Sequence, residues 1–184
     1  MSLTPSSMLP LDTKLPHFSL WDTVSGATIT SSDYKRQPLL VFFICNHCPY
    51  VVHIIDKLVK IANEAMNNNV DCIAISSNDI NTHPADNPAN MTKFAKDHQF
   101  RFPYCFDETQ CVAKAFHAEC TPDLFLFDSN QSLFYRGRFD EATPGNNKPI
   151  DGRDLTRALD ALNNQLPPPP NQSPSVGCNI KWRQ

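Results

Sequence analysis

The sequence predicts an α/β protein whose central, mixed β-sheet is flanked by helices on both faces. Three observations predict this class: a strand–helix–strand unit over residues 39–76, a β-hairpin over residues 124–139, and an amphipathic helix at about residues 152–164. A strand–helix–strand crossover joins parallel strands, whereas a hairpin joins antiparallel strands. The sheet should therefore contain both arrangements.

The N-terminal part is expected to add a β-hairpin to this sheet. Residues 1–15 contain Pro5 and Pro10 and should form an irregular lead-in. Phe18–Trp21 and Ala27–Thr30 are short strand-like segments, and the residues between them, which include Gly26, are typical of a turn. Together they predict an N-terminal hairpin extension.

The central unit follows from its hydrophobic pattern. Leu39–Ile44 is a continuous apolar run, typical of a strand that is buried on both faces. The next segment predicts a helix, because its apolar residues recur at steps of three and four: Val51, Ile54, Ile55, Leu58, Ile61, Ala62, Ala65 and Met66. Three asparagines end this helix, and Val70–Ser76 predicts a second buried strand.

The remaining elements are shorter. A polar loop at residues 77–90 precedes a helix near residues 91–98, an extended segment at 102–107 and a short helix at 109–117. Strands at 124–127 and 132–139 form the later hairpin, and Asp151 is the expected N-cap of the final helix. Four consecutive prolines begin a tail that ends with a cysteine, an isoleucine and a tryptophan, so this tail should dock back on the body. The predicted organisation is a lead-in (1–15), one domain (16–166) and a Pro-rich tail (167–184).

Composition excludes several classes of partner. The net charge is −3, and no long run of basic residues is present, which argues against nucleic acid. No apolar stretch is long enough for a membrane span, so we expect no membrane association. The N-terminal residues lack the pattern of a secretion signal, which predicts a cytoplasmic protein. In that compartment a close cysteine pair is more often catalytic or metal-binding than structural.

Cys45 and Cys48 form the motif that carries chemistry. The chain has seven cysteines, and only these two are closely spaced, at the junction of the buried strand and the helix. Unpaired N–H groups at a helix N-terminus stabilise a thiolate, so we expect Cys45 to have a lowered pKa and Cys48 to lie one turn inside the helix. Protonated His47 would favour the Cys45 thiolate further.

The longer pattern resembles the thioredoxin-like superfamily, and within it the group of the alkyl hydroperoxide reductase/thiol-specific antioxidant (AhpC/TSA) family. The resemblance rests on ICNHCPYV, AISSND, FPYCFDETQCVAKAF, CTPDLFLFD, YRGRFD and GCNIKW, and it covers about residues 15–184. It implies a thioredoxin-like fold, a cis peptide bond before Pro122, and Thr121 and Pro122 as substrate-binding residues that face the cysteines. It also implies that Asn46 and His47 set the redox potential.

Three departures from thioredoxin are present. Ile44 stands where thioredoxin has a tryptophan, and Asn46-His47 replaces Gly-Pro between the cysteines. Histidine in this position resembles the oxidising periplasmic thiol oxidases. The strand LLVFF also carries no equivalent of thioredoxin's buried acid, which removes a candidate proton acceptor for Cys48.

Two alternatives to a thiol–disulfide oxidoreductase stay open. A thiol peroxidase of the peroxiredoxin type has the motif Pro-x-x-x-Thr-x-x-Cys, but counting back from Cys48 places Cys45 in the Thr position and Val41 in the Pro position. A metal-binding or redox-sensing module would use soft thiolate ligands, yet a zinc site normally needs four ligands, and the sequence supplies no second cysteine pair.

The predicted function is thiol–disulfide exchange by the CxxC motif, with Cys45 as the attacking residue and Cys48 as the resolving residue. No cofactor and no metal are expected. The expected partners are a disulfide-containing protein or small-thiol substrate, and a thiol reductant or reductase. Cys120 and Cys178 are possible auxiliary thiols: they are either inert buried residues, a second disulfide, or a relay to the main pair.

Overall fold

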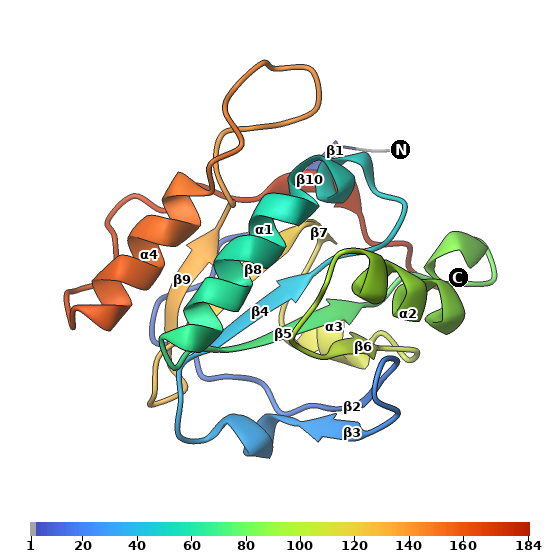
Figure 1. Ribbon diagram of the computed structural model, residues 1–184, viewed down its shortest axis with the longest axis horizontal. Helices are drawn as coiled ribbons and strands as arrows, with labels where there is room; N and C mark the ends of the chain where they lie inside the picture. Colours follow the sequence, from blue (N-terminus) through green and yellow to red (C-terminus); the bar gives the residue numbers. More distant parts are fainter. Residues whose placement is uncertain (1–2) are drawn as a thin grey trace.

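A seven-stranded mixed sheet forms the centre of the computed structural model, which describes residues 3–184 (Figure 1). Its strand order is β3-β2-β6-β5-β4-β8-β9. The strands are β2 (Ser19–Asp22), β3 (Thr28–Thr30), β4 (Leu39–Phe43), β5 (Asp71–Ser76), β6 (Tyr104–Phe106), β8 (Asp123–Phe127) and β9 (Leu133–Gly137). β4 pairs parallel with β5 and antiparallel with β8, which confirms the predicted mixed sheet. β2 and β3 form the predicted N-terminal hairpin, and β2 joins it to β6.

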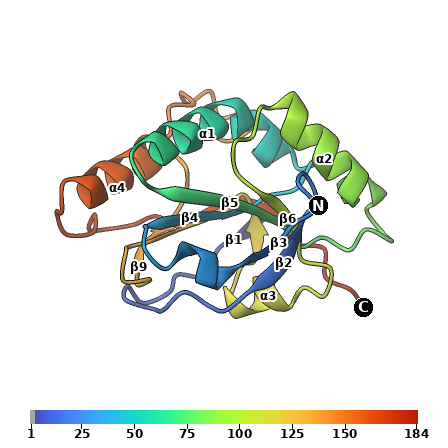
Figure 2. The same ribbon diagram turned by 60° about the horizontal axis from the view of Figure 1, so that its bottom comes forward.

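Helices cover both faces of this sheet (Figure 2). On one face lie α1 (Pro49–Asn67), α2 (Pro88–Asp97) and α4 (Arg153–Asn163), and on the other lies the short α3 (Cys111–Ala115). β4 serves both layers, because Leu40 and Phe42 pack in the core on the α1 side whereas Val41 and Phe43 pack in the core on the α3 side. Within residues 3–184, no helix combines the length and the apolar character that crossing a bilayer requires.

The two ends of the described chain meet in a second, three-stranded sheet. Its order is β1 (Leu3–Pro5), β10 (Val176–Asn179) and β7 (Cys120–Thr121), all antiparallel. The segment 1–15, predicted to be irregular, therefore contributes a strand, although Met1 and Ser2 lie outside the described residues. β1 forms because β10 of the tail offers it an edge, a long-range pairing that no local pattern reveals.

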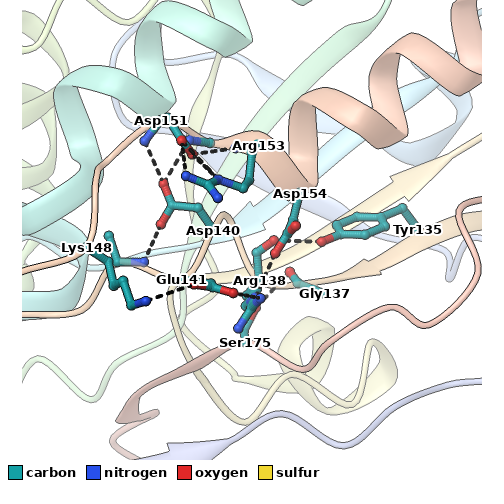
Figure 3. Close-up of polar contacts among 12 residues, drawn as sticks. Tyr135, Gly137, Arg138, Asp140, Glu141, Lys148, Asp151, Arg153, Asp154 and Ser175 are labelled. Carbon is teal, nitrogen blue, oxygen red and sulfur yellow. Dashed lines mark hydrogen bonds and ion pairs between the residues drawn. The ribbon is translucent and has the colours of Figure 1, made fainter. Parts of the chain in front are cut away.

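The start of α4 differs from the prediction. Its N-cap is Gly152, in the left-handed region at φ 66°, and not Asp151. Asp140 instead satisfies this end of the helix, because its Oδ2 accepts the N–H groups of Asp151 (2.9 Å) and Gly152 (2.7 Å) (Figure 3). Asp151 accepts the backbone N–H of Arg153, the first helical residue, at 3.0 Å, and its carboxylate also pairs with the Arg153 guanidinium at 2.7 Å. A carboxylate twelve residues before the N-cap thus adds to the local one.

Candidate active site

Cys45 and Cys48 lie where β4 leads into α1. Cys48 is the N-cap of α1, and Pro49 occupies the first helical position. Proline favours that position, because its φ angle is preset and its missing N–H would have no helical partner there. Cys48 therefore stands at the helix boundary and not one turn inside it, and Cys45 lies outside the helix. Both side chains are buried, at 1 % and 0 % exposure.

The loop at Thr121-Pro122 faces these two thiols. The peptide bond before Pro122 is cis, as the resemblance implied. The Thr121 hydroxyl lies 3.6 Å from Cys45 Sγ. Cys48 Sγ lies 3.1 Å from the Thr121 carbonyl oxygen, to which Cys48 donates a hydrogen bond when it is protonated. Thr121 thus contacts both sulfur atoms and holds them beside the cis-proline.

The two thiols differ in acidity. A hydrogen bond from the Cys45 thiol stabilises the Cys48 thiolate and lowers the pKa of Cys48 to about 5, against the opposing effect of burial. The same hydrogen bond, then burial, then the negative charge of Asp86 raise the pKa of Cys45 well above its usual value. The reduced pair therefore carries one thiolate, centred on Cys48. This order differs from the expectation that Cys45 is the more acidic thiol, because the hydrogen bond between the two thiols favours the charged form of Cys48.

A buried carboxylate, Asp86, organises the residues between the cysteines. It ends the 3₁₀ turn Pro84–Asp86 and is 0 % exposed. Its oxygens lie 2.7 Å from His47 Nδ1 and accept hydrogen bonds from the Asn46 backbone N–H and the Asn78 side chain, both at 2.8 Å. His47 Nδ1 is also 4.0 Å from Cys45 Sγ. Asp86 therefore fixes His47 next to the Cys45 thiol.

Asp86 is not among the site residues that the sequence predicts. It lies in the polar segment 77–90, which the residue pattern identifies only as a loop. One signal points to it: this loop follows β5, the parallel neighbour of β4, and the carboxyl ends of neighbouring parallel strands meet at one edge of a sheet. A buried acid thus reaches the site from the loop after β5, whereas β4 carries none.

Asn46 and His47 each have further contacts that hold them in place. The Asn46 side chain donates to the Ala85 carbonyl oxygen and accepts from the Tyr104 hydroxyl, both at 3.0 Å. The His47 ring stacks on the His83 ring, with centroids 5.4 Å apart. Both residues between the cysteines are therefore tied to the loop that carries Asp86.

The two auxiliary thiols lie in different environments. Cys120 is 0 % exposed, and burial raises its pKa. Cys178 lies opposite Thr121 in the β7–β10 register, whereas Cys120 lies opposite Asn179. Because alternate residues of a strand point to opposite faces, Cys120 and Cys178 point away from each other, and the structure offers no support for a disulfide between them. Cys178 instead hydrogen-bonds with Cys48.

A pocket of about 90 Å³ lies beside Pro122. Its walls come from α1, the cis-proline loop, the segment after β9 and the start of β10: Tyr50, Ile54, Pro122, Arg138, Phe139, Asp140, Glu141, Ala142, Thr143, Pro174, Ser175 and Val176. The charge of Arg138 in this wall is already compensated, since its guanidinium contacts Asp154 at 2.7 Å and Glu141 at 3.3 Å (Figure 3). The pocket thus combines apolar walls with a neutralised ionic rim.

Comparison with known proteins gives consistent matches. Residues 11–136 match the AhpC/TSA family. An uncharacterized conserved protein from Geobacillus kaustophilus shares 43% identity, with 100% of this chain and 97% of that one covered and a TM-score of 0.97. A hypothetical protein from Sinorhizobium meliloti shares 40% identity over 98% of each chain, with a TM-score of 0.95. Among curated proteins no relative is found.

A more distant structure shares the fold alone. The thioredoxin domain of a thiol-disulfide oxidoreductase from Bacteroides vulgatus is 14% identical, with 83% of this chain and 99% of that one covered and a TM-score of 0.63. The mixed sheet and its flanking helices thus follow a known architecture. The chain belongs to the AhpC/TSA family and has a thioredoxin-like fold.

Proposed function

We propose that this protein is a thiol–disulfide oxidoreductase in which Cys45 and Cys48 alternate between a dithiol and a disulfide. The observation that carries the proposal is the placement of both sulfurs against Thr121, next to the cis-proline, with one thiolate between them. A thiolate is the form that attacks a disulfide, and a neighbouring thiol resolves the mixed disulfide. The family assignment, with its thiol-dependent redox chemistry, agrees with this function.

In the proposed mechanism Cys45 attacks first. The proton shared by the two thiols moves from Cys45 to Cys48, which places the thiolate on Cys45, beside His47. Cys45 Sγ then attacks one sulfur of the substrate disulfide, forms a mixed disulfide and releases the other sulfur as a thiolate. Cys48 Sγ then attacks Cys45 Sγ, and the Cys48 proton passes to the departing substrate sulfur. The second substrate thiol is released, and the Cys45–Cys48 disulfide remains. The reverse sequence oxidises a dithiol substrate.

The neighbouring residues have supporting roles in this mechanism. Asn46 and His47 set the potential of the couple, and Asp86 holds His47 in place. Thr121 orients the sulfurs, and Pro122, which lines the pocket, contacts the substrate. The substrate is a disulfide-containing protein or small thiol compound, and a thiol reductant or reductase in the cytoplasm regenerates the dithiol.

A peroxidase is less well supported by the site. Cys45 and Val41 occupy the positions where peroxiredoxins have Thr and Pro. Peroxiredoxins also use an arginine to hold the peroxide, and Arg136 does not supply one beside the thiols. It is fully buried on the other side of the sheet, where its guanidinium lies 4.5 Å from the Phe125 ring and 3.2 Å from Asp123. Consumption of hydrogen peroxide coupled to thiol oxidation, faster than disulfide exchange, would favour the peroxidase over the proposed function.

Trapping of the mixed disulfide tests the proposal. The Cys48→Ser variant cannot resolve the intermediate, so incubation with a disulfide substrate should leave a covalent adduct on Cys45, identified by peptide mapping. The matched control is Cys48→Ser combined with Cys45→Ser, which should lose this adduct. The exposed Cys111 provides an internal standard for non-specific labelling. Adducts on Cys111 without any on Cys45 would contradict the proposal.

One observation favours a second candidate function, the binding of a soft metal ion. Ligand atoms of Cys45, His47 and Asp86 all lie within 4.8 Å of one another. Three ligands of these types match a zinc site with one open position, although the metal would have to replace the contact between His47 and Asp86. Equilibrium dialysis of the reduced protein against Zn(II) tests this function, which requires stoichiometric binding that is lost in Cys45→Ser.

A further inference from the structure

Cys178 is delivered to the cysteine pair by an unusually close approach of two strands. It lies in β10, directly opposite Thr121 of β7. β10 lies beside the first turn of α1 (Figure 1). Gly177, the preceding residue, makes this approach possible, because a Cβ atom there would overlap the Thr121 carbonyl group. The tail is therefore held against the residue that contacts both Cys45 and Cys48.

The side chain of Cys178 points to the face that carries these thiols. Residues directly opposite in an antiparallel pair share a face, so Cys178 and Thr121 point the same way. Cys178 and Cys48 belong to the same buried core cluster, at 4 % and 0 % exposure, and their thiols are hydrogen-bonded. Cys48 therefore has two thiol neighbours, Cys45 and Cys178.

We propose that Cys178 is a third redox thiol, which exchanges with the Cys45–Cys48 disulfide to form a Cys48–Cys178 disulfide. This inference rests on the proposed function. Cys178 Sγ attacks Cys48 Sγ, the Cys48–Cys178 bond forms, and the Cys45–Cys48 bond breaks. The proton of Cys178 passes to the released Cys45, so the net charge of the buried site is unchanged. One disulfide bond replaces another within the protein, so the overall oxidation state does not change and no outside oxidant is needed.

The electrostatics of the site fit this exchange. Burial, followed by the hydrogen bond and the negative charge of Cys48, raises the pKa of Cys178 to about 12 in the reduced protein. Once Cys48 is part of a disulfide its negative charge is gone, and only burial still opposes ionisation of Cys178. Cys178 is therefore inert in the dithiol form and becomes a better nucleophile after the main pair is oxidised.

The exchange has a functional consequence. It returns Cys45, the attacking residue, to its thiol form while the protein still holds an oxidised disulfide. The tail thus gives the enzyme an internal acceptor, and a second substrate can react at Cys45 before an outside reductant acts. Cys120 is excluded from this role, since it points to the opposite face of the strand.

The experiment uses the full-length Cys45→Ser variant, treated with oxidised glutathione and mapped by mass spectrometry without reduction. Glutathione should first attach to Cys48, and Cys178 should then displace it, which gives a peptide pair cross-linked through Cys48 and Cys178. In Cys45→Ser/Cys178→Ser the glutathione should remain on Cys48. The matched control Cys45→Ser/Cys120→Ser should still form the cross-link. Cys45→Ala provides the same readout should the serine variant be poorly folded.

The outcomes separate this inference from the proposed function. A Cys45→Ser protein that retains glutathione on Cys48, with Cys178 unmodified, would overturn the role of Cys178. If wild-type protein treated in the same way forms the Cys45–Cys48 disulfide, the proposed function stands even then. Failure of the wild type to form that disulfide would overturn the proposed function itself.

Discussion

The carboxylate of Asp86 lies 2.7 Å from Nδ1 of His47, the residue that precedes the second cysteine. This contact fixes the His47 side chain, because the Asp86 carboxylate, which has no exposure to solvent, faces the imidazole that contacts Cys45. Asp86 therefore places a buried negative charge near Cys45, where it helps to raise the pKa of that thiol. This charge comes from a loop and not from β4.

Replacement of Asp86 with asparagine is expected to alter both stability and thiol acidity. The asparagine retains the shape but not the charge of a group that accepts two hydrogen bonds and contacts His47, so the free energy of unfolding should fall by about 1–3 kcal/mol in urea titrations. The pKa of Cys45, which is raised by the Cys48 hydrogen bond, by burial and by Asp86, should decrease. Asp97→Asn, an exposed acid on α2, is the control and should change neither quantity. Unaltered values in Asp86→Asn would remove Asp86 from the account.

The reduced protein is expected to ionise one thiol with a midpoint near pH 5. Cys48 has its pKa lowered to about 5, chiefly by the Cys45 hydrogen bond, and it stays protonated in the unfolded chain until pH nears 9. The folded form thus binds fewer protons in this range, so the contribution of Cys48 to stability increases as pH rises from about 5 to about 9 and is lost as pH falls through 5. Thiolate absorbance of the reduced protein measures the midpoint, and Cys48→Ser should abolish it. A midpoint near 9 would contradict the assigned thiolate.

Replacement of His47 with alanine is expected to make the couple more reducing. Asp86 would then face Cys45 without its histidine partner, which destabilises the thiolate and hence the dithiol form. The reduction potential should become more negative, by about 30 mV for each 1.4 kcal/mol of lost stabilisation. His98→Ala is a matched control, because His98 also contacts a carboxylate at 2.7 Å, that of Asp56, on the surface of the protein. Equal potentials in wild type and His47→Ala would show that His47 does not set the potential.

Introduction of a methyl group at Gly177 is expected to disrupt the docking of the tail. The new Cβ would overlap the Thr121 carbonyl group, so Gly177→Ala should lower the free energy of unfolding by at least about 1–3 kcal/mol, as overpacking does. Gly26→Ala is the control, since Gly26 has a positive φ of 78° but open space around it. Its free energy of unfolding should fall less, by an amount that reflects backbone strain alone. Comparable losses in both variants would mean that β10 adapts easily to the added methyl group.

The elements of the fold that rest on local patterns are predictable from the sequence. The apolar run Leu39–Ile44, the periodic helix after it and the second buried run give β4, α1 and β5 nearly to the residue. Features that depend on distant partners are not predictable in this way. β1 exists only because β10 pairs with it, and Asp140 binds the N-cap of α4 from twelve residues upstream. In both cases a long-range hydrogen bond determines the structure, and local propensity does not encode it.

The candidate site divides in the same manner. The spacing of Cys45 and Cys48 and the Thr121-Pro122 dipeptide identify two parts of it from the sequence alone. The order of acidity of the two thiols is harder to predict, because it depends chiefly on the hydrogen bond between them and on their burial. Asp86 and Cys178 are brought to the site by a loop and by the tail, 38 and more than 100 residues away from Cys48 in the chain. Their proximity is a property of the sheet topology.

The central claim is that Cys45 and Cys48 form a reversible two-electron couple, and a redox titration tests it most directly. The protein is equilibrated in glutathione or dithiothreitol buffers of graded potential, the remaining thiols are alkylated, and the Cys45–Cys48 disulfide is quantified by peptide mapping. We predict a single two-electron transition between about −270 and −120 mV, the range of known couples of this type. The transition should persist in Cys178→Ser and vanish in Cys45→Ser. Absence of a Cys45–Cys48 disulfide across the whole range would contradict the account.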